Sequence, residues 1–172
     1  ADQITVIAWV YPTQSATTST AKTRGCAVGG YDSMYLGIID NTDPNSSALH
    51  WAIKAGGSRP TSWTGAIPNN QWTMIVGTYD GTTSRAYINT SEVWSGALTG
   101  NIDKGSSLLW LGTYNGNTDS NHNWKGDISN VKIFNRALTA EEIAVEYKRT
   151  GETKMTQHNG TVYIQGKIKE TV

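Results

Sequence analysis

The stretch Trp124–Tyr147, WKGDISNVKIFNRALTAEEIAVEY, changes its periodicity at its middle. In its first half Ile128, Val131 and Ile133 lie among polar residues, which is typical of a half-buried β-strand. The step from Ile128 to Val131 is three residues instead of two, and it predicts a β-bulge or bend.

The second half of the stretch begins a helix at LTAEEI. Thr139 can accept a hydrogen bond from the amide of Glu142, and the Glu142 side chain can accept one from the amide of Thr139. Leu138 can pack on Ile143 as a hydrophobic staple. We therefore predict a short helix over about Thr139–Lys148.

The run G-x-I-x-x-V-x-I-[FY]-N-R-A-L-[ST]-x-x-E-I resembles the C-terminal signature of laminin-G-like domains of the concanavalin A-like lectin/glucanase superfamily. The resemblance spans about Ile4 to Tyr147 and implies an all-β, two-sheet antiparallel jelly-roll sandwich with one short C-terminal helix. Further matches to the family lie upstream at Gln71–Thr73, Gly77–Gly81, Arg85–Asn89 and Leu109–Gly112.

The length, net charge and composition of the chain limit the classes of protein to which it can belong. The chain has 172 residues, which predicts one domain with a substantial core. The formal net charge is +0, so nothing indicates binding to nucleic acid or anionic lipid. No apolar run reaches membrane-spanning length, and Cys26 is the only cysteine, so no disulfide can form within the chain. This composition is typical of sandwiches that are extracellular or displayed on a cell or virion surface.

A hairpin is predicted in the middle of the chain. Trp72–Tyr79 and Ser84–Asn89 flank Asp80-Gly81, the strongest short-range turn signal present. The stretch Ala55–Asn70 is expected to be a long ordered loop or an edge. Further strands are predicted at Ile4–Tyr11, Gly25–Gly30, Met34–Asp40, Leu49–Lys54 and Leu108–Tyr114.

The chain divides into a laminin-G-like domain over residues 1–150 and a C-terminal extension over residues 151–172. Thr161–Glu170 alternates as one strand, with Val162, Ile164 and Ile168 on its apolar side. The usual first strand of the family, ahead of the Ile4 strand, is absent. The extension is therefore expected to complete the sandwich or to contact a neighbouring chain, and the alternative is an exposed tail of a larger protein.

Catalysis is not expected. Glucanases with this jelly roll need two carboxylates about 5 Å apart on a strand face. No strand of this sequence carries acidic residues at alternating positions, and helix capping accounts for Glu141 and Glu142. Nucleophile-elbow and paired-histidine metal motifs are also missing from the sequence.

The polar loop after the Leu108 strand is the predicted ligand site. It places side-chain oxygens at every second position, which suits a calcium ion, although turns are often rich in Asn and Asp. The metal ligands indicated by this spacing are Asn117, Asp119 and Asn121, and no other cofactor is indicated.

Carbohydrate is the ligand class that the resemblance implies. Tyr114 and Trp124 bracket the loop and could provide a stacking face beside the amides, while the alternative for Trp124 is packing. Trp63 and Tyr31 also lie at loops or strand ends. The predicted core aromatics are Trp9, Trp51, Trp72, Trp110, Tyr79 and Tyr87, and the predicted ligand-binding set is Tyr114, Asn115, Asn117, Asp119, Asn121, His122 and Trp124.

Two functions remain open on the sequence alone. The first is a non-catalytic module that recognises carbohydrate or a protein surface through rim loops. The second is a structural or display domain of a virion, adhesin or cell-surface assembly that acts through protein–protein contacts. An unpaired edge strand would favour oligomers or a larger assembly.

Overall fold

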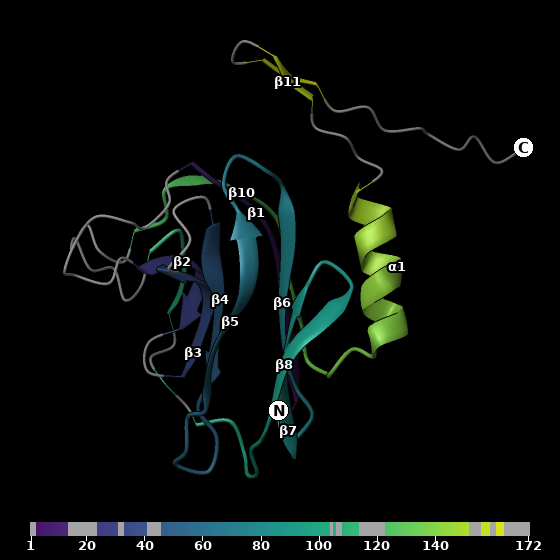
Figure 1. Ribbon diagram of the computed structural model, residues 1–172. Coiled ribbons are helices and arrows are strands. Elements are labelled where there is room, and N and C mark those ends of the chain that lie inside the picture. The colour runs from purple at the N-terminus through teal and green to yellow at the C-terminus, as the bar shows by residue number, and fades with distance from the viewer. Residues whose placement is uncertain are drawn as a thin grey trace, which may run out of the picture.

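The computed structural model describes residues 3–13, 24–30, 33–40, 46–103, 105, 108–113, 123–151, 156–158 and 161–163. Two five-stranded antiparallel sheets pack face to face (Figure 1). The sheet beside the helix, here called the helix-side sheet, has the order β10-β1-β6-β7-β8, and the opposite sheet has the order β5-β4-β3-β2-β9. This arrangement confirms the predicted sandwich.

Most strand bounds follow the sequence pattern, but one strand, Ser91–Ala97, was not predicted from it. The helix-side sheet contains β1 (Ile4–Pro12), β6 (Thr73–Tyr79), β7 (Thr83–Ile88), β8 (Ser91–Ala97) and β10 (Gly126–Phe134). The opposite sheet contains β2 (Arg24–Gly30), β3 (Met34–Asp40), β4 (Ser46–Ile53), β5 (Thr61–Pro68) and β9 (Leu109–Leu111). The Ala55–Asn70 stretch therefore supplies an edge strand, and the predicted Leu108–Tyr114 strand is shorter than expected.

Trp51 joins the two sheets across the core. Its indole is fully buried, and its Nε1–H donates to the Ser84 hydroxyl of the helix-side sheet at 2.8 Å. Gly77 faces this ring, and any Cβ at that position would overlap it. The surrounding core residues include Val6, Ala8, Val10, Leu36, Ile38, Leu49, Ile53, Ile75 and Tyr79.

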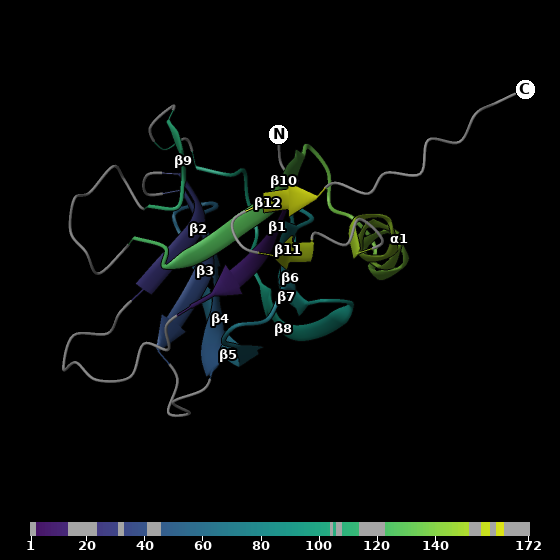
Figure 2. The same ribbon diagram turned by 90° about the horizontal axis from the view of Figure 1, so that it is seen from above.

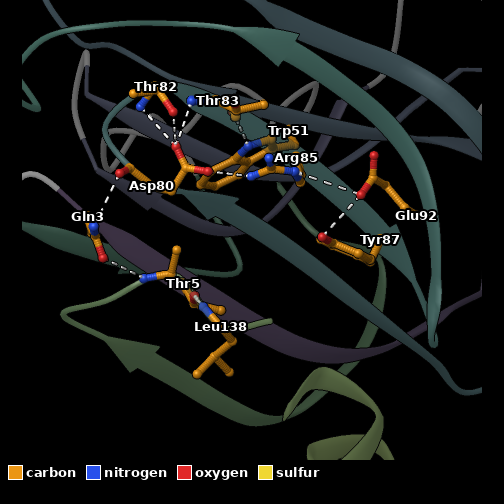
Figure 3. Close-up of polar contacts among 12 residues, drawn as sticks. Gln3, Thr5, Trp51, Asp80, Thr82, Thr83, Arg85, Tyr87, Glu92 and Leu138 are labelled. Carbon is orange, nitrogen blue, oxygen red and sulfur yellow. Dashed lines mark hydrogen bonds and ion pairs between the residues drawn. The ribbon is translucent and has the colours of Figure 1, made fainter. Parts of the chain in front are cut away.

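The predicted β6–β7 hairpin is confirmed, and Asp80 organises its turn (Figure 3). The Asp80 carboxylate accepts from the amides of Thr82 and Thr83 at 2.9 and 2.7 Å and from the Arg85 guanidinium. Burial opposes ionisation of Asp80, but these hydrogen bonds outweigh it and hold its pKa well below the usual range. Because the Asp80 carboxylate bonds to residues of the turn, its role is structural.

The predicted bulge lies in β10. Asn130 has a φ of 47°, and the pairing of β10 with β1 shifts between Ile7 and Trp9. The extra residue lets Ile128 and Val131 both pack against the core between the sheets.

Helix α1 (Ala140–Gly151) begins where the sequence predicts. The Glu142 carboxylate accepts from the Thr139 amide at 3.0 Å, and the Thr139 hydroxyl accepts from the Glu142 amide at 3.3 Å. Leu138 and Ile143 are both buried in the cluster under the helix, which confirms the staple. The helix ends at Gly151, three residues beyond the predicted Lys148.

Thr5 fixes the connection between β10 and α1. Its buried hydroxyl donates to the Arg136 carbonyl and accepts from the Leu138 amide, both at 2.8 Å (Figure 3). Tyr147 stacks on Trp9 with ring centroids 5.4 Å apart. The helix therefore runs in the same direction as β1, over the outer face of the helix-side sheet.

The described part of the extension is a short hairpin. β11 (Thr156–His158) and β12 (Thr161–Tyr163) pair with each other and form a sheet of their own. Most of the predicted Thr161–Glu170 strand lies outside the described residues. How the extension is used remains a prediction. Within the described part of the chain, no helix has the length and apolar character needed to cross a membrane.

Candidate functional site

Most of the predicted loop site lies outside the described residues. Tyr114, Asn115, Asn117, Asp119, Asn121 and His122 all belong to this group. Their ligand-binding role and the calcium site of Asn117, Asp119 and Asn121 remain predictions. Among the described residues, no three acidic, His or Cys side chains gather into a metal-binding group.

The base of this loop is described, and it is closed by hydrogen bonds. The Trp124 amide donates to the Gly112 carbonyl at 2.7 Å, and the Gly112 amide donates to the Ala27 carbonyl at 3.1 Å. Gly112 has a φ of 75°, a conformation that favours glycine. The two ends of the loop are thus held side by side on β2.

Trp124 is half-buried and packs against the core between the sheets. A Cβ added to Gly25 would lie 3.1 Å from the Trp124 ring, so the indole rests directly on the β2 backbone. Its Nε1 is buried, and no described residue accepts a hydrogen bond from it. This packing fits the scaffold alternative, while a ligand contact by Trp124 remains a prediction.

A second candidate site crosses the outer face of the opposite sheet. Trp63, His50 and Tyr35 lie on β5, β4 and β3, and we call them the aromatic row. The Tyr35 and His50 rings are 4.3 Å apart, and the His50 and Trp63 rings meet edge to face at 6.1 Å. Tyr35 and His50 are 3% and 2% exposed, whereas Trp63 is 54% exposed. The row therefore runs from the buried Tyr35 and His50 rings, its base, to the exposed Trp63 indole.

The strand register places Trp110 on the same face. Gly29 pairs with Tyr35 on one side and with Trp110 on the other, and paired residues point to one face of a sheet. Aromatic residues thus flank a glycine at the β9 end of the sheet. Because the row lies on paired strands, its geometry is fixed by the sheet.

Cys26 supports the base of the row. It is fully buried in one cluster with Tyr35 and Ala52. Burial raises the pKa of the Cys26 thiol to about 12, so the thiol is protonated at neutral pH. The residue is a packing group and lacks the thiolate that nucleophilic chemistry requires.

Sequence reasoning placed Trp63 at a loop or strand end and did not connect it with His50. The direct pairing of His50 with Trp63 depends on the β4–β5 register, which is set between segments distant in sequence. Of the predicted core aromatics, Trp9, Trp51, Tyr79 and Tyr87 are buried and Trp72 and Trp110 are half-buried.

Solved structures of similar fold come from several kinds of protein. Domain 4 of AbnA, an extracellular GH43 arabinanase from Geobacillus stearothermophilus in complex with arabinotriose, has a TM-score of 0.56 at 23% identity over 84% of this chain and 66% of that one. A putative carbohydrate binding protein from Bacteroides ovatus has a TM-score of 0.62 at 18% identity over 83% of this chain and 40% of that one.

A third similar structure is botulinum neurotoxin type C, whose cell entry is described as dependent on interaction with two ganglioside molecules. It has a TM-score of 0.60 at 13% identity over 90% of this chain and 37% of that one. The chain thus spans only 37–66% of these proteins' lengths. At these identities the likeness shows the fold alone.

No curated protein matches the sequence. The Laminin_G_3 family, described as concanavalin A-like lectin/glucanases superfamily, matches residues 1–144, most of the chain. This match includes every strand of the sandwich and the start of the helix. The chain therefore belongs to the Laminin_G_3 family of the concanavalin A-like lectin/glucanase superfamily.

Proposed function

We propose that this chain is a non-catalytic, lectin-like module that binds carbohydrate at the open end of the aromatic row. The observation that carries the proposal is the Trp63 indole, 54% exposed and edge to face with a buried His50. A rigid exposed indole offers an apolar face to the C–H side of a sugar ring at low cost in conformational entropy.

The ligand is not expected to be a polyanion. The chain has a formal net charge of +0, which provides no general attraction for polyanions. Domain 4 of AbnA is in complex with arabinotriose, and cell entry of botulinum neurotoxin type C is described as dependent on interaction with two ganglioside molecules, which supports a saccharide as the ligand class. A glycan-binding module of this type would act outside the cell or on a cell or virion surface.

The test is binding of neutral oligosaccharides, including arabino-oligosaccharides, by glycan array and calorimetry. Trp63→Ala should weaken binding by at least about fivefold, because a central aromatic contact is typically worth more than about 1 kcal/mol. Val145→Ala is the matched control, since Val145 is 62% exposed on α1 and far from the row in the fold. Its affinity should equal that of the wild type.

Calcium dependence forms a second arm of the same experiment. If the loop site contributes, chelator should weaken glycan binding and Asp119→Ala should reproduce that loss without lowering stability, because one exposed carboxylate contributes little to folding. If Asp119→Ala loses glycan binding while Trp63→Ala binds glycan fully, the binding site is the loop and not the aromatic row.

A chain that binds no glycan with or without calcium would contradict the proposal. Stable oligomers in the same preparation would then favour the alternative function, a structural or display domain that acts through protein contacts.

A further inference from the structure

Core-facing aliphatic side chains are exposed at one side of the sandwich. Leu111 pairs with the buried Val28, and Ile133 pairs with the buried Val6, so both point toward the space between the sheets. Leu109, two residues from Leu111, shares its face. Nevertheless, Leu111 is 56% exposed, Leu109 is 48% exposed and Ile133 is 44% exposed.

The exposed residues lie on the edge strands of the two sheets, β9 and β10. Figure 2 shows β9 beyond β2, at the same side of the molecule as β10. A Cβ at Gly112, just after β9, would lie 3.9 Å from the side chain of Ile128 in β10, so the two edges meet at that end. Beyond this contact, Leu109 and Leu111 of β9 and Ile133 of β10 remain exposed.

β9 also presents unused backbone groups. The Gly112 amide donates to Ala27 of β2. Because hydrogen-bonded and non-hydrogen-bonded pairs alternate in an antiparallel ladder, the N–H and C=O groups of Leu111 and Leu109 point away from β2. In the described part of the chain no strand pairs with β9 on that side. This edge has both the hydrogen-bonding groups and the apolar face that accept another strand.

The chain carries a segment with the matching pattern at its C-terminus. Residues 164–172 read IQGKIKETV, with Ile164, Gly166 and Ile168 on one side and Gln165, Lys167 and Lys169 on the other. A strand with this alternation would place its isoleucines over the exposed leucines of β9 and its lysines in solvent. Lysines on a new edge strand would also discourage pairing with further chains.

The helix that precedes the extension ends at the same end of the sandwich as Gly112, the residue after β9. α1 begins beside Thr5 and reaches Trp9 at Tyr147, so it ends near the Pro12 end of β1. At this end Thr13 bonds to Lys125 ahead of β10, and Trp124 bonds to Gly112 after β9. A strand entering here would run antiparallel to β9. The segment 164–172 can extend about 30 Å, which exceeds the length of β9 several-fold.

We propose that residues 164–172 add as an antiparallel strand to the free edge of β9 and cover Leu109, Leu111 and Ile133 with Ile164 and Ile168. The extension then completes the opposite sheet of its own chain. This assignment is independent of glycan binding and rests only on the edge geometry and the sequence of the extension.

The test is residue-resolved amide hydrogen exchange on the full chain. The amides of Leu109 and Leu111 should be protected in the wild type and should exchange at least about tenfold faster in Ile164→Lys/Ile168→Lys. Gln165→Lys is the matched control, because it introduces the same residue at the next position on the opposite face. It should leave the exchange at β9 unchanged.

Three results would overturn the proposal. Fast exchange of both leucine amides in the wild type would show a free edge, and equal acceleration by Ile164→Lys/Ile168→Lys and Gln165→Lys would show no side-specific packing. Protection that appears only with a dimer in light scattering would assign the edge to a second copy of the chain.

Discussion

The outer faces of the two sheets differ in how they are formed. On the helix-side sheet, Ile143 and Tyr147 of α1 cover Ile7, Trp9 and other apolar residues. On the opposite sheet, the outer face carries an aromatic row that ends in an exposed indole. The first face is covered by a helix that follows β10 directly in sequence. The second is assembled from strands whose order is set by the whole fold.

This contrast separates stability from recognition. A capped helix over one sheet closes a second core and adds buried apolar area. The other sheet ends its aromatic row in the exposed Trp63 indole, where the proposed ligand would bind without disturbing that core. Substitutions on the two faces should therefore affect different measurements.

Ile143→Ala should give the largest effect on the helix-covered face. The side chain is fully buried, and its truncation should lower the free energy of unfolding by about 3 kcal/mol. Urea unfolding measures this loss, and Val145→Ala on the same helix should change stability by less than about 0.5 kcal/mol. A small effect of Ile143→Ala would mean that α1 is not tightly docked.

Thr139→Ala should have an intermediate effect. Loss of the hydroxyl that accepts from the Glu142 amide should cost about 1 kcal/mol. Thr139→Ser keeps that hydroxyl and should restore most of the stability. An unchanged denaturation midpoint with unchanged slope in Thr139→Ala would contradict its role as the N-cap.

The same cap should produce a small acid-sensitive component of stability. Hydrogen bonds from Arg136 and from the Thr139 amide lower the pKa of Glu142 to about 2 from 4.5. Because the folded-state pKa is lowered, the contribution is fully present above pH 4.5 and is lost as the pH falls toward 2. The stability difference between wild type and Glu142→Gln should therefore shrink over that range, and salt should reduce it, since the pair is exposed. A difference that stays constant with pH would contradict the assignment.

In the opposite sheet, the smallest expected effect concerns the reactivity of the Cys26 thiol. A fully buried thiol with a pKa near 12 should not react with a disulfide reagent at mildly alkaline pH until the protein unfolds. Trp63→Ala should leave this protection intact, because Cys26 lies at the buried base near Tyr35. Rapid labelling of the native protein would show that this face opens readily.

The parts of the fold that could be predicted are those set by neighbours in sequence. The Thr139–Glu142 cap, the Asp80-Gly81 hairpin and the β10 bulge each depend on residues within a few positions of one another. Their chemistry is local, so the pattern is sufficient to predict them.

The parts that could not be predicted depend on register between distant segments. The pairing of His50 with Trp63, the bond from Trp51 to Ser84 and the exposure of Leu111 each follow from which strands become neighbours. A sequence pattern assigns a residue to one face of a strand, but it does not state what lies across from it.

The hydrogen bond between Trp124 and Gly112 affects which sequences the loop between them can accept. Trp124 is bonded to Gly112, and Gly112 is bonded to Ala27 of β2, so the two ends of the loop are held by residues outside positions 114–122. Doubling the length of such a loop costs only about 0.6 kcal/mol in closure entropy. We therefore expect positions 114–122 to accept insertions and foreign binding sequences, which makes this domain a scaffold on which new recognition loops can be displayed.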